Sequence, residues 1–550
     1  MKPTHKIFYL ILVVLALGVN FAGIDLKFFT DDPGLYASIA KNLIYKNHFW
    51  ELFTYNRDWL DKPHFPFWMM YCSFKLFGIS EWAYRLPALL FFTIGVLYTW
   101  LFTKKYYDKE TAVMAVLILA TALNTMLGNT DARAEPYLIG LIIAAIYHIA
   151  ALNTRFSYKH LLLAALFTAF AVMTKGIFVV VAVYGALLGH LWLTGRFKSL
   201  FGLKWLGLVL LTLVFTLPEF YALYIQFDLH PEKTIFERQH VSGIKWFLWD
   251  SQFGRFVNNG PITRKTSGSV FFYLHTLLWA FAPWCLLFYF AMIRSIHDIL
   301  RRSQLPEYFA LSGGILLLLL FSLSRFQLPF YTNALFPLFA IITAPLCLRK
   351  LDTFGTKFRA VVLWIFIAGL PVAVFVLNTL LKPANNFAIL TGVLLFGVIA
   401  ALVIIRLKEP AVRTFLLACL STLFAGFYIN TVFYKEIIPY KGQIAAAEWV
   451  NQNLSPATPV YVLNAENNLF QFYCKRQVDL MPPAQFNNAA AGDALFYVNQ
   501  QTMEALVQSH ASVKLVRSFV DYPKENLSLQ FIDRSTRIKT LGQVYLITRN

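Results

Sequence analysis

Two consecutive carboxylates, Asp31 and Asp32, follow the first long apolar stretch of this 550-residue sequence. Pro33 comes next, and the apolar residues behind it recur at helical spacing, which makes Asp32 a candidate helix N-cap. A carboxylate held at a membrane surface is also partly desolvated, and desolvation raises its basicity. Asp32 is therefore either a plain cap or a general base that takes a proton during a reaction.

Three more charged residues lie close together in the short polar segment 128–136, namely Asp131, Arg133 and Glu135. Asp131 and Glu135 are four residues apart, so they would share a face if this segment were helical. Ionisable side chains at a bilayer edge are costly, which makes them candidates for function rather than mere surface anchors. Lys175, between two apolar stretches, is a similar candidate, although it could also be an ordinary lysine at the end of a span.

A lysine stands beside a carboxylate, among aromatic residues, in the motif Asp61-Lys62-Pro63. This pair could be a local ion pair that anchors the chain at the membrane interface. It could also bind a phosphate, because a lysine ammonium is a compact donor for that group. Arg255 and Tyr331 stand in similar aromatic surroundings further along the chain.

The elements that must position these residues are membrane spans. Hydrophobic residues make up 58% of the sequence and charged residues only 14%, which excludes a disordered chain and an ordinary cytosolic enzyme. About thirteen apolar stretches are long enough, or nearly so, to cross a bilayer. They cover residues 7–24, 83–103, 111–127, 136–152, 159–174, 176–194, 204–224, 270–293, 307–324, 328–348, 357–379, 386–406 and 411–431.

Basic residues indicate how these spans are oriented. The net charge is 48 − 29 = +19, which in a soluble protein would suggest a nucleic-acid partner. Here about twenty Lys and Arg residues fall on the side of the N-terminus, whereas the short loops on the other side hold about four. The positive-inside rule then places the N-terminus in the cytoplasm and the C-terminus outside, and no nucleic acid is expected as a partner.

Two long outer loops, 25–82 and 225–269, and a C-terminal part lie outside the spans. In the C-terminal part the pattern predicts helices at 444–450 and 503–507 and strands at 459–463, 494–498 and 544–547. The expected organisation is a transmembrane domain over residues 1–435 and an outer α/β domain over residues 436–550. No paired cysteine spacing, zinc motif or nucleotide-binding motif is visible in the sequence.

The same residues resemble a known family, the bacterial lipid A aminoarabinose transferases and their protein O-mannosyltransferase relatives. The resemblance covers most of the membrane part, in order. It is carried by the runs 31–40, 67–68 and 74–87, the motifs Asp61-Lys62-Pro63 and Thr174-Lys175-Gly176, and the segments 281–284 and 328–331.

This resemblance implies the type C glycosyltransferase fold and a bacterial inner-membrane enzyme that takes a sugar from a polyprenyl-phosphate carrier in the periplasm. Asp32 would be the catalytic acid of the first outer loop. Glu135, with Asp131 as a neighbouring candidate, would be the acidic residue of the second outer loop. Lys62 would hold the carrier phosphate, and Tyr331 would lie near that head group.

Two positions differ from the aminoarabinose transferases. Their Glu-Lys-Pro is Asp61-Lys62-Pro63 in this chain, and their histidine shortly before Arg-Phe corresponds to Gln252 before Arg255-Phe256. In that family these two positions resemble a zinc site. Asp61 is therefore a candidate ligand of a divalent metal here, and the cofactor stays open.

The leading hypothesis is a glycosyltransferase that displaces polyprenyl phosphate from the anomeric carbon of the sugar, with inversion. Asp32, helped by Glu135 or Asp131, would orient or deprotonate the acceptor. The candidate cations for the donor phosphate are Lys62, Arg133, Lys175 and Arg255. The acceptor is an envelope lipid such as lipid A, or a protein or glycan hydroxyl, and the enzyme is expected to be a monomer.

Two alternatives come from other classes of protein. One is a transporter or flippase for lipid-linked sugars, but such proteins place ionisable groups at mid-membrane and often contain inverted repeats. Here the acids gather at one face, and no repeat is evident. The other alternative is a binding or assembly protein that uses the C-terminal α/β domain.

Overall fold

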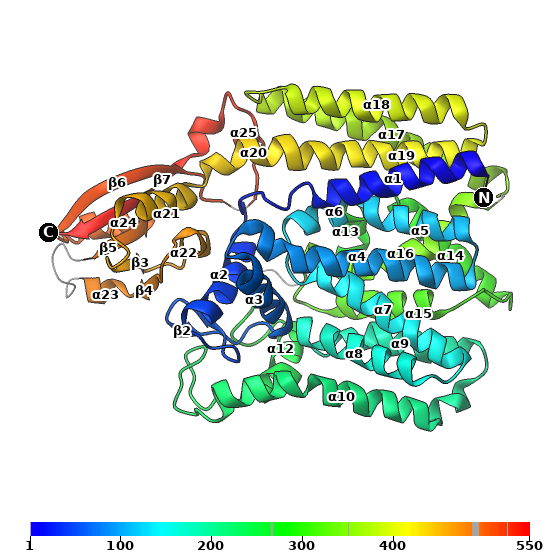
Figure 1. Cartoon of the computed structure of the whole chain (residues 1–550), viewed down its shortest axis with the longest axis horizontal. Coiled ribbons are helices and arrows are strands. Elements are labelled where there is room, and N and C mark those ends of the chain that lie inside the picture. Colours follow the sequence, from blue (N-terminus) through cyan, green and yellow to red (C-terminus); the bar gives the residue numbers. More distant parts are fainter. Residues whose placement is uncertain (1, 266–267, 350, 487–493, 525) are drawn as a thin grey trace.

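The computed structural model of the protein describes residues 2–265, 268–349, 351–486, 494–524 and 526–550. It is a bundle of long helices with a small sheet beyond one end, called the sheet end below (Figure 1). The bundle helices are α1 (Pro3–Phe21), α4 (Glu81–Tyr106), α5 (Lys109–Thr121), α6 (Leu123–Thr130), α7 (Glu135–Thr154), α8 (Tyr158–Lys175), α9 (Val179–Leu193), α10 (Leu203–Leu223), α13 (Phe272–Ala280), α14 (Cys285–Leu300), α15 (Phe309–Leu323), α16 (Phe336–Leu348), α17 (Thr353–Leu381), α18 (Phe387–Arg406) and α19 (Pro410–Tyr428).

Each apolar stretch that the sequence predicts as a span contains helix. Among the described residues, eight helices are by themselves long and apolar enough to cross a membrane, or nine if the bent pair α5 and α6 is one span. A helix satisfies its own backbone hydrogen bonds, which is why apolar sequence takes this form in lipid. The prediction of a polytopic α-helical membrane protein is confirmed.

Two of the predicted spans are broken, and the two breaks face each other. α5 and α6 meet at an angle of 54° around Ala122, and the stretch 270–293 is divided between α13 and α14. The amide of Leu123 at the first break donates to the carbonyl of Ala282 at the second, 3.0 Å away. Each break thus helps to satisfy the backbone of the other, as a buried interruption of a span requires.

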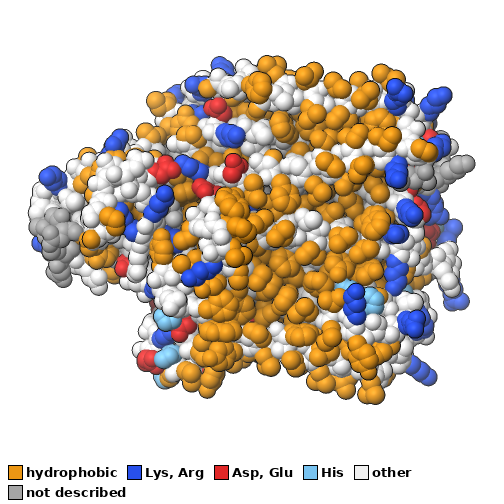
Figure 2. Space-filling model, viewed as in Figure 1, with side chains coloured by type: hydrophobic (Ala, Val, Ile, Leu, Met, Phe, Trp, Pro, Cys, Tyr) orange, Lys and Arg blue, Asp and Glu red, His pale blue; other side chains and the backbone are white. Residues whose placement is uncertain are grey.

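Charged side chains separate along the bundle axis. Figure 2 shows a broad hydrophobic belt with Lys and Arg gathered at the end remote from the sheet, while Asp and Glu concentrate toward the sheet end. This is the separation of charge that the positive-inside distribution of the loops predicts.

Short elements from the two long loops fill the space between bundle and sheet (Figure 1). The first loop forms α2 (Asp31–Tyr45), β1 (Phe53–Thr54), β2 (Arg57–Asp58) and α3 (Phe65–Phe77), and the second forms α11 (Gly243–Lys245) and α12 (Ser251–Val257). The prediction of Asp32 as an N-cap is wrong by two residues, because Thr30 holds that position. Asp32 lies in the first turn instead, where a negative charge also suits the helix dipole.

The C-terminal part contains a five-stranded sheet in the order β4-β3-β5-β7-β6. Strand β3 runs parallel to β4 and β5, whereas β7 runs antiparallel to β5 and β6. The elements are α21 (Gly442–Asn453), β3 (Val460–Leu463), α22 (Asn468–Tyr473), β4 (Asp479–Met481), α23 (Pro483–Phe486), β5 (Leu495–Asn499), α24 (Gln500–Gln508), β6 (Val513–Asp521), α25 (Leu529–Ile532) and β7 (Gly542–Arg549). The five predicted elements are present, and α22, β4, α23, β6 and α25 are additional to them.

Both faces of this sheet are covered. On one face Val462 and Leu546 pack with Val450 of α21 and Phe470 of α22. On the other face Phe496 and Ile547 pack with side chains of α23 and α24. Because both faces of the sheet are covered, β3 and β5 are buried on both sides, and their residues alternate little between polar and apolar.

Helices α4 and α7 pack with their backbones in close contact. A Cβ added to Gly140 would lie 2.1 Å from the carbonyl oxygen of Phe91, which is backbone and cannot move aside cheaply. Small residues let membrane helices approach in this way. The pair places the first residue of α7, Glu135, firmly against the rest of the bundle.

Gly140→Ala is expected to destabilise the bundle by about 1–3 kcal/mol, because it overpacks a backbone contact. The measurement is the thermal unfolding midpoint in detergent. Gly369→Ala on α17 is the matched control, since a Cβ at Gly369 meets nothing within 4 Å. Equal midpoints for the two variants would contradict the tight α4–α7 contact.

Candidate functional site

Asp32 opens the site at the start of α2. Its carboxylate forms an ion pair with Arg133, whose guanidinium also binds Asp131 through Nη2 at 2.6 Å and Nε at 3.0 Å. The Thr30 hydroxyl donates to the other Asp131 oxygen. The Asp32 side chain is 51% exposed, whereas those of Asp131 and Arg133 are 27% and 15% exposed. Asp32 is thus the accessible acid of the cluster, and Asp131 holds the arginine in place.

Glu135 and Lys175 form a second pair beside the first. Glu135 is the first residue of α7 and Lys175 the last of α8, and the ammonium donates to the carboxylate with both side chains buried. Asp131 instead ends α6, so the two acids do not share a helical face and take different cations. The helix ends therefore fix which carboxylate neutralises which base.

Aromatic rings of the segment η4 (Pro329–Leu335) lie against both cations. The Lys175 ammonium lies 4.0 Å from the centre of the Tyr331 ring, and the Arg133 guanidinium lies 4.5 Å from the centre of the Phe330 ring. A cation over an aromatic face gains attraction from the ring quadrupole. These rings join the two ion pairs into one continuous site.

A third group ties the two long loops together. Lys62 Nζ lies 2.7 Å from one oxygen of Asp61, and Arg255 donates to the other. Arg255 also donates to the Ser251 hydroxyl at 2.9 Å, within α12. Burial lowers the pKa of the Lys62 ammonium, and the proximity of Tyr331 and Asp32 partly offsets that effect. One carboxylate thus holds two cations next to each other.

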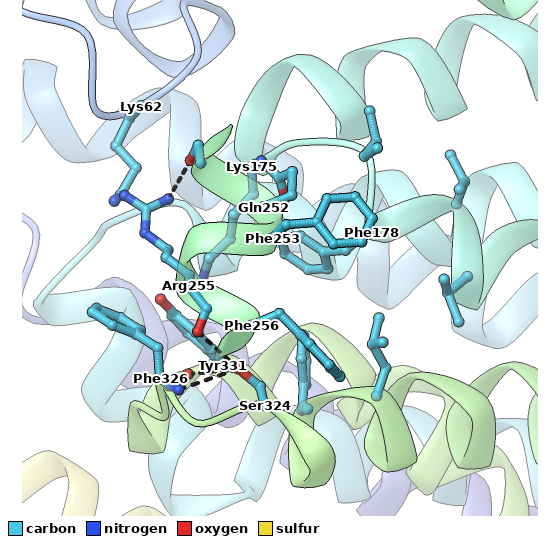
Figure 3. Close-up of a pocket in the computed structure, with 16 residues that line it drawn as sticks. Lys62, Lys175, Phe178, Gln252, Phe253, Arg255, Phe256, Ser324, Phe326 and Tyr331 are labelled. Atoms are coloured by element: carbon cyan, nitrogen blue, oxygen red, sulfur yellow. Dashed lines mark hydrogen bonds between the residues drawn. The ribbon is translucent and has the colours of Figure 1, made fainter. Parts of the chain in front are cut away.

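These cations stand at the polar end of an apolar cavity of about 310 Å³ (Figure 3). Lys62, Lys175, Arg255 and Tyr331 line it at one end. Most of the remaining lining is apolar and comes largely from the start of α9 and from α12 and α15: Phe178, Val181, Phe253, Phe256, Leu320 and Phe321. Such a cavity fits a molecule with an anionic head and a hydrocarbon tail.

The turn that carries Lys175 depends on the glycine after it. Gly176 has a φ of +103°, and a Cβ there would lie 2.4 Å from the side-chain amide of Gln252. Only glycine combines that backbone conformation with so close a neighbour. The motif Thr174-Lys175-Gly176 therefore directs the lysine into the site and lets α12 pack over it.

Asp61 is paired with cations rather than grouped with other metal-ligating side chains. Its two carboxylate oxygens are taken by Lys62 and Arg255, and the neighbouring Gln252 supplies a neutral amide. Within the described part of the chain, no three His, Cys, Asp or Glu side chains are grouped as a metal site would require. The arrangement instead resembles a cation pair held ready for an anion.

Sequence reasoning missed one buried pair that supports the site. Glu219 of α10 accepts a hydrogen bond from the backbone amide of His64 at 3.0 Å and lies 2.9 Å from His64 Nδ1. Both side chains are almost wholly buried, at 0% and 1% exposure. This pair fixes the chain just after Lys62. An acid inside an apolar stretch was the available signal, because such residues are costly in a membrane.

All nine candidate residues of the sequence lie in these three linked groups. Lys62, Lys175, Arg255 and Tyr331 share the cavity, Arg133 and Lys175 share the Phe330 ring, and Asp61 joins Lys62 to Arg255. The structure therefore brings together, from seven separate elements and turns, the residues that the spacing and the resemblance single out.

Sequence comparison finds partial similarity to glycosyltransferases. Residues 61–221 match the family model described as dolichyl-phosphate-mannose-protein mannosyltransferase. The chain is 24% identical over 384 residues to the undecaprenyl phosphate-alpha-4-amino-4-deoxy-L-arabinose arabinosyl transferase of Erwinia tasmaniensis, covering 69% of this chain and 61% of that protein. It is 26% identical over 317 residues to an uncharacterized protein of Aquifex aeolicus, covering 57% of this chain and 58% of that protein. The chain thus spans less than two thirds of the length of these curated relatives.

The fold comparison extends over the whole chain. The crystal structure of ArnT from Cupriavidus metallidurans bound to undecaprenyl phosphate is similar with a TM-score of 0.73 and 18% sequence identity, covering 100% of this chain and 98% of that one. The chain therefore has the fold of that structure, the type C glycosyltransferase fold that its sequence motifs predict.

Proposed function

We propose that this protein is a membrane glycosyltransferase that moves a sugar from a polyprenyl-phosphate carrier to an acceptor. The observation that carries the proposal is the apolar cavity with Lys62, Lys175 and Arg255 at its polar end, close to the accessible carboxylate of Asp32. A polyprenyl phosphate has the matching chemistry, an anionic head on a hydrocarbon chain. The relatives named above that use or bind undecaprenyl phosphate support this choice of carrier.

In the proposed reaction an acceptor oxygen attacks the anomeric carbon of the sugar. The bond from that carbon to the phosphate oxygen breaks, and the electron pair leaves on the phosphate. Lys62 and Arg255 stabilise the charge that grows there. If the acceptor is a hydroxyl, its proton passes to Asp32, whereas a phosphate acceptor needs only orientation. A single displacement inverts the configuration at the anomeric carbon.

The other two acids take supporting parts in this scheme. Glu135 is buried and paired with Lys175, so it keeps that cation charged and in place near the donor phosphate. Asp131 holds Arg133 in place through its own ion pair. Asp32 differs from both because half of its side chain is open to an incoming acceptor.

We place the protein in a bacterial inner membrane with the sheet end on the periplasmic side. The basic residues at the opposite end of the bundle support this orientation (Figure 2). Residues 1–435 then form the transferase domain, and residues 436–550 form a periplasmic α/β domain. The preferred acceptor is an envelope lipid such as lipid A, with a protein or glycan hydroxyl as the second class, and the enzyme acts as a monomer.

The direct test is to mix purified protein with an undecaprenyl-phosphate sugar and envelope lipids, glycans or proteins, and to identify products by mass spectrometry. Asp32→Asn should lower kcat by about 100-fold or more for a hydroxyl acceptor, since it removes the general base. Movement of a labelled lipid across liposomes without any product would favour the flippase instead.

Lys62→Ala is expected to raise the donor KM by about 10- to 100-fold, the value of a lost hydrogen bond to a charged group. The pKa of Lys62 is lowered by burial, so its ammonium is present below that pKa and is lost as the pH rises through it. Donor KM should therefore rise at alkaline pH. Lys62→Arg keeps its charge and should lack that alkaline rise. An identical KM-pH profile for wild type and Lys62→Arg would contradict the assignment.

Glu219→Leu is expected to raise the donor KM by about 10-fold, because the buried His64 amide loses its acceptor and the Lys62 segment is no longer fixed. Glu219→Gln keeps an acceptor oxygen and should restore most of the affinity. Thr216→Val on the same helix is the control, since its hydroxyl bonds only within α10. A donor KM that does not change in Glu219→Leu would remove the residue from the site.

A further inference from the structure

Helix α22 of the C-terminal part lies against α2, the helix that carries Asp32 (Figure 1). The two helices approach so closely that a Cβ on Gly34 would lie 2.9 Å from Leu469 Cδ2 and 3.2 Å from the backbone carbon of Asn468. The Ser38 hydroxyl donates to the Asn468 carbonyl at 3.2 Å. The backbones of the two helices are therefore in direct contact, which is closer than packing through side chains alone.

Side chains of α2 hold both ends of α22. At its first residue, Asp31 accepts hydrogen bonds from the Asn468 amide at 3.2 Å and from the Asn468 side chain at 2.6 Å. At its other end, the Lys41 ammonium donates to the carbonyls of Gln471, of Phe472 at 3.2 Å and of Cys474 at 2.9 Å. An acid thus meets amides and a cation meets carbonyls, each with the sign of charge that those groups favour.

Lys41 shows how specific this contact is. The side chain is only 1% exposed, and burial lowers the pKa of its ammonium to about 8. A buried lysine is costly unless its donors are satisfied. Here three backbone carbonyls from one short segment satisfy them, so the position of α22 relative to α2 is strongly determined.

The two neighbouring acids of α2 therefore point to different partners. Asp31 binds α22, while Asp32 faces Arg133 and the open site. We propose that α22 acts as a clamp on α2, with Asp31 and Lys41 as positioning residues that hold Asp32 where the acceptor is bound. This inference rests on the proposed transfer reaction. It gives the C-terminal part a direct role in turnover through the packing of a single helix.

The first test separates kcat from KM. Asp31→Ala in the full-length protein is expected to lower kcat by about 10- to 100-fold, the cost of a small misplacement of a reacting group, with the donor KM within about two-fold of wild type. Asp31→Asn keeps an acceptor oxygen for Asn468 and should recover most of the rate. Asn468→Ala, which removes the opposite side of the same contact, should lower kcat as Asp31→Ala does.

Lys27→Ala is the matched control. It removes an ion pair to Glu448 of α21, which also joins the membrane part to the C-terminal part, but both side chains are exposed, at 41% and 43%. An exposed pair of this kind contributes little, so kcat should stay at the wild-type value. An unchanged kcat in Asp31→Ala, an increase in KM alone, or an equal loss in Lys27→Ala would each overturn the clamp.

The second test does not depend on activity. Hydrogen exchange of the amides of residues 31–45 is expected to be faster in Asp31→Ala and in Lys41→Met than in wild type, while α7 and α8 stay unchanged. Unaltered exchange over 31–45 in both variants overturns the clamp whether or not transfer is detected. If wild-type protein transfers no sugar while this exchange is altered, the proposed function fails and the α2–α22 contact stands.

Discussion

The site depends on one constraint, which is that cations placed at a membrane boundary must be held by carboxylates, and each of the three groups joins a carboxylate and a cation from distant parts of the chain. Arg133 is held by Asp32 and Asp131, Lys175 by Glu135, and the pair Lys62 and Arg255 by Asp61. Removing a charge from water is expensive, and only a well-placed partner offsets that cost. The ion pairs therefore decide how the helix ends and loops must meet, and the hydrophobic bundle supplies the frame on which they do so.

The bundle serves this constraint through its interruptions. The break at Ala122 turns α6, whose end carries Asp131 and Arg133 toward α2. The glycine after Lys175 turns the chain from α8 into α9 beneath α12. Backbone that leaves the helical form inside a membrane is tolerated only where protein satisfies it, and the carbonyl of Ala282 does this for the break at Ala122. Regular helix elsewhere keeps the site rigid.

Much of this arrangement could be predicted from the sequence, for identifiable physical reasons. An apolar stretch long enough to cross a bilayer forms a helix in lipid, so the spans could be predicted from the sequence. The candidate site residues could be predicted because charged residues are rare in such a chain. Contacts between distant segments could not be predicted, because Glu219 and His64 are 155 residues apart and Asp31 and Asn468 are 437 apart. The Asp32 capping position was missed because Thr30, Asp31 and Asp32 are all good caps, and local spacing does not choose among them.

The Asp61 carboxylate, which Lys62 and Arg255 share, affects how an anion would enter the site. Two neighbouring cations without a counter-ion would repel each other and would not stay buried. Asp61 therefore keeps Lys62 and Arg255 together when no phosphate is bound. An arriving phosphate offers more oxygens than one carboxylate, so it can bind the outer faces of both cations while Asp61 retains the inner ones. In the proposed reaction the cations are then oriented before the donor arrives, and little reorganisation is needed when charge develops on the leaving group. A carboxylate that binds no substrate can in this way contribute to the rate.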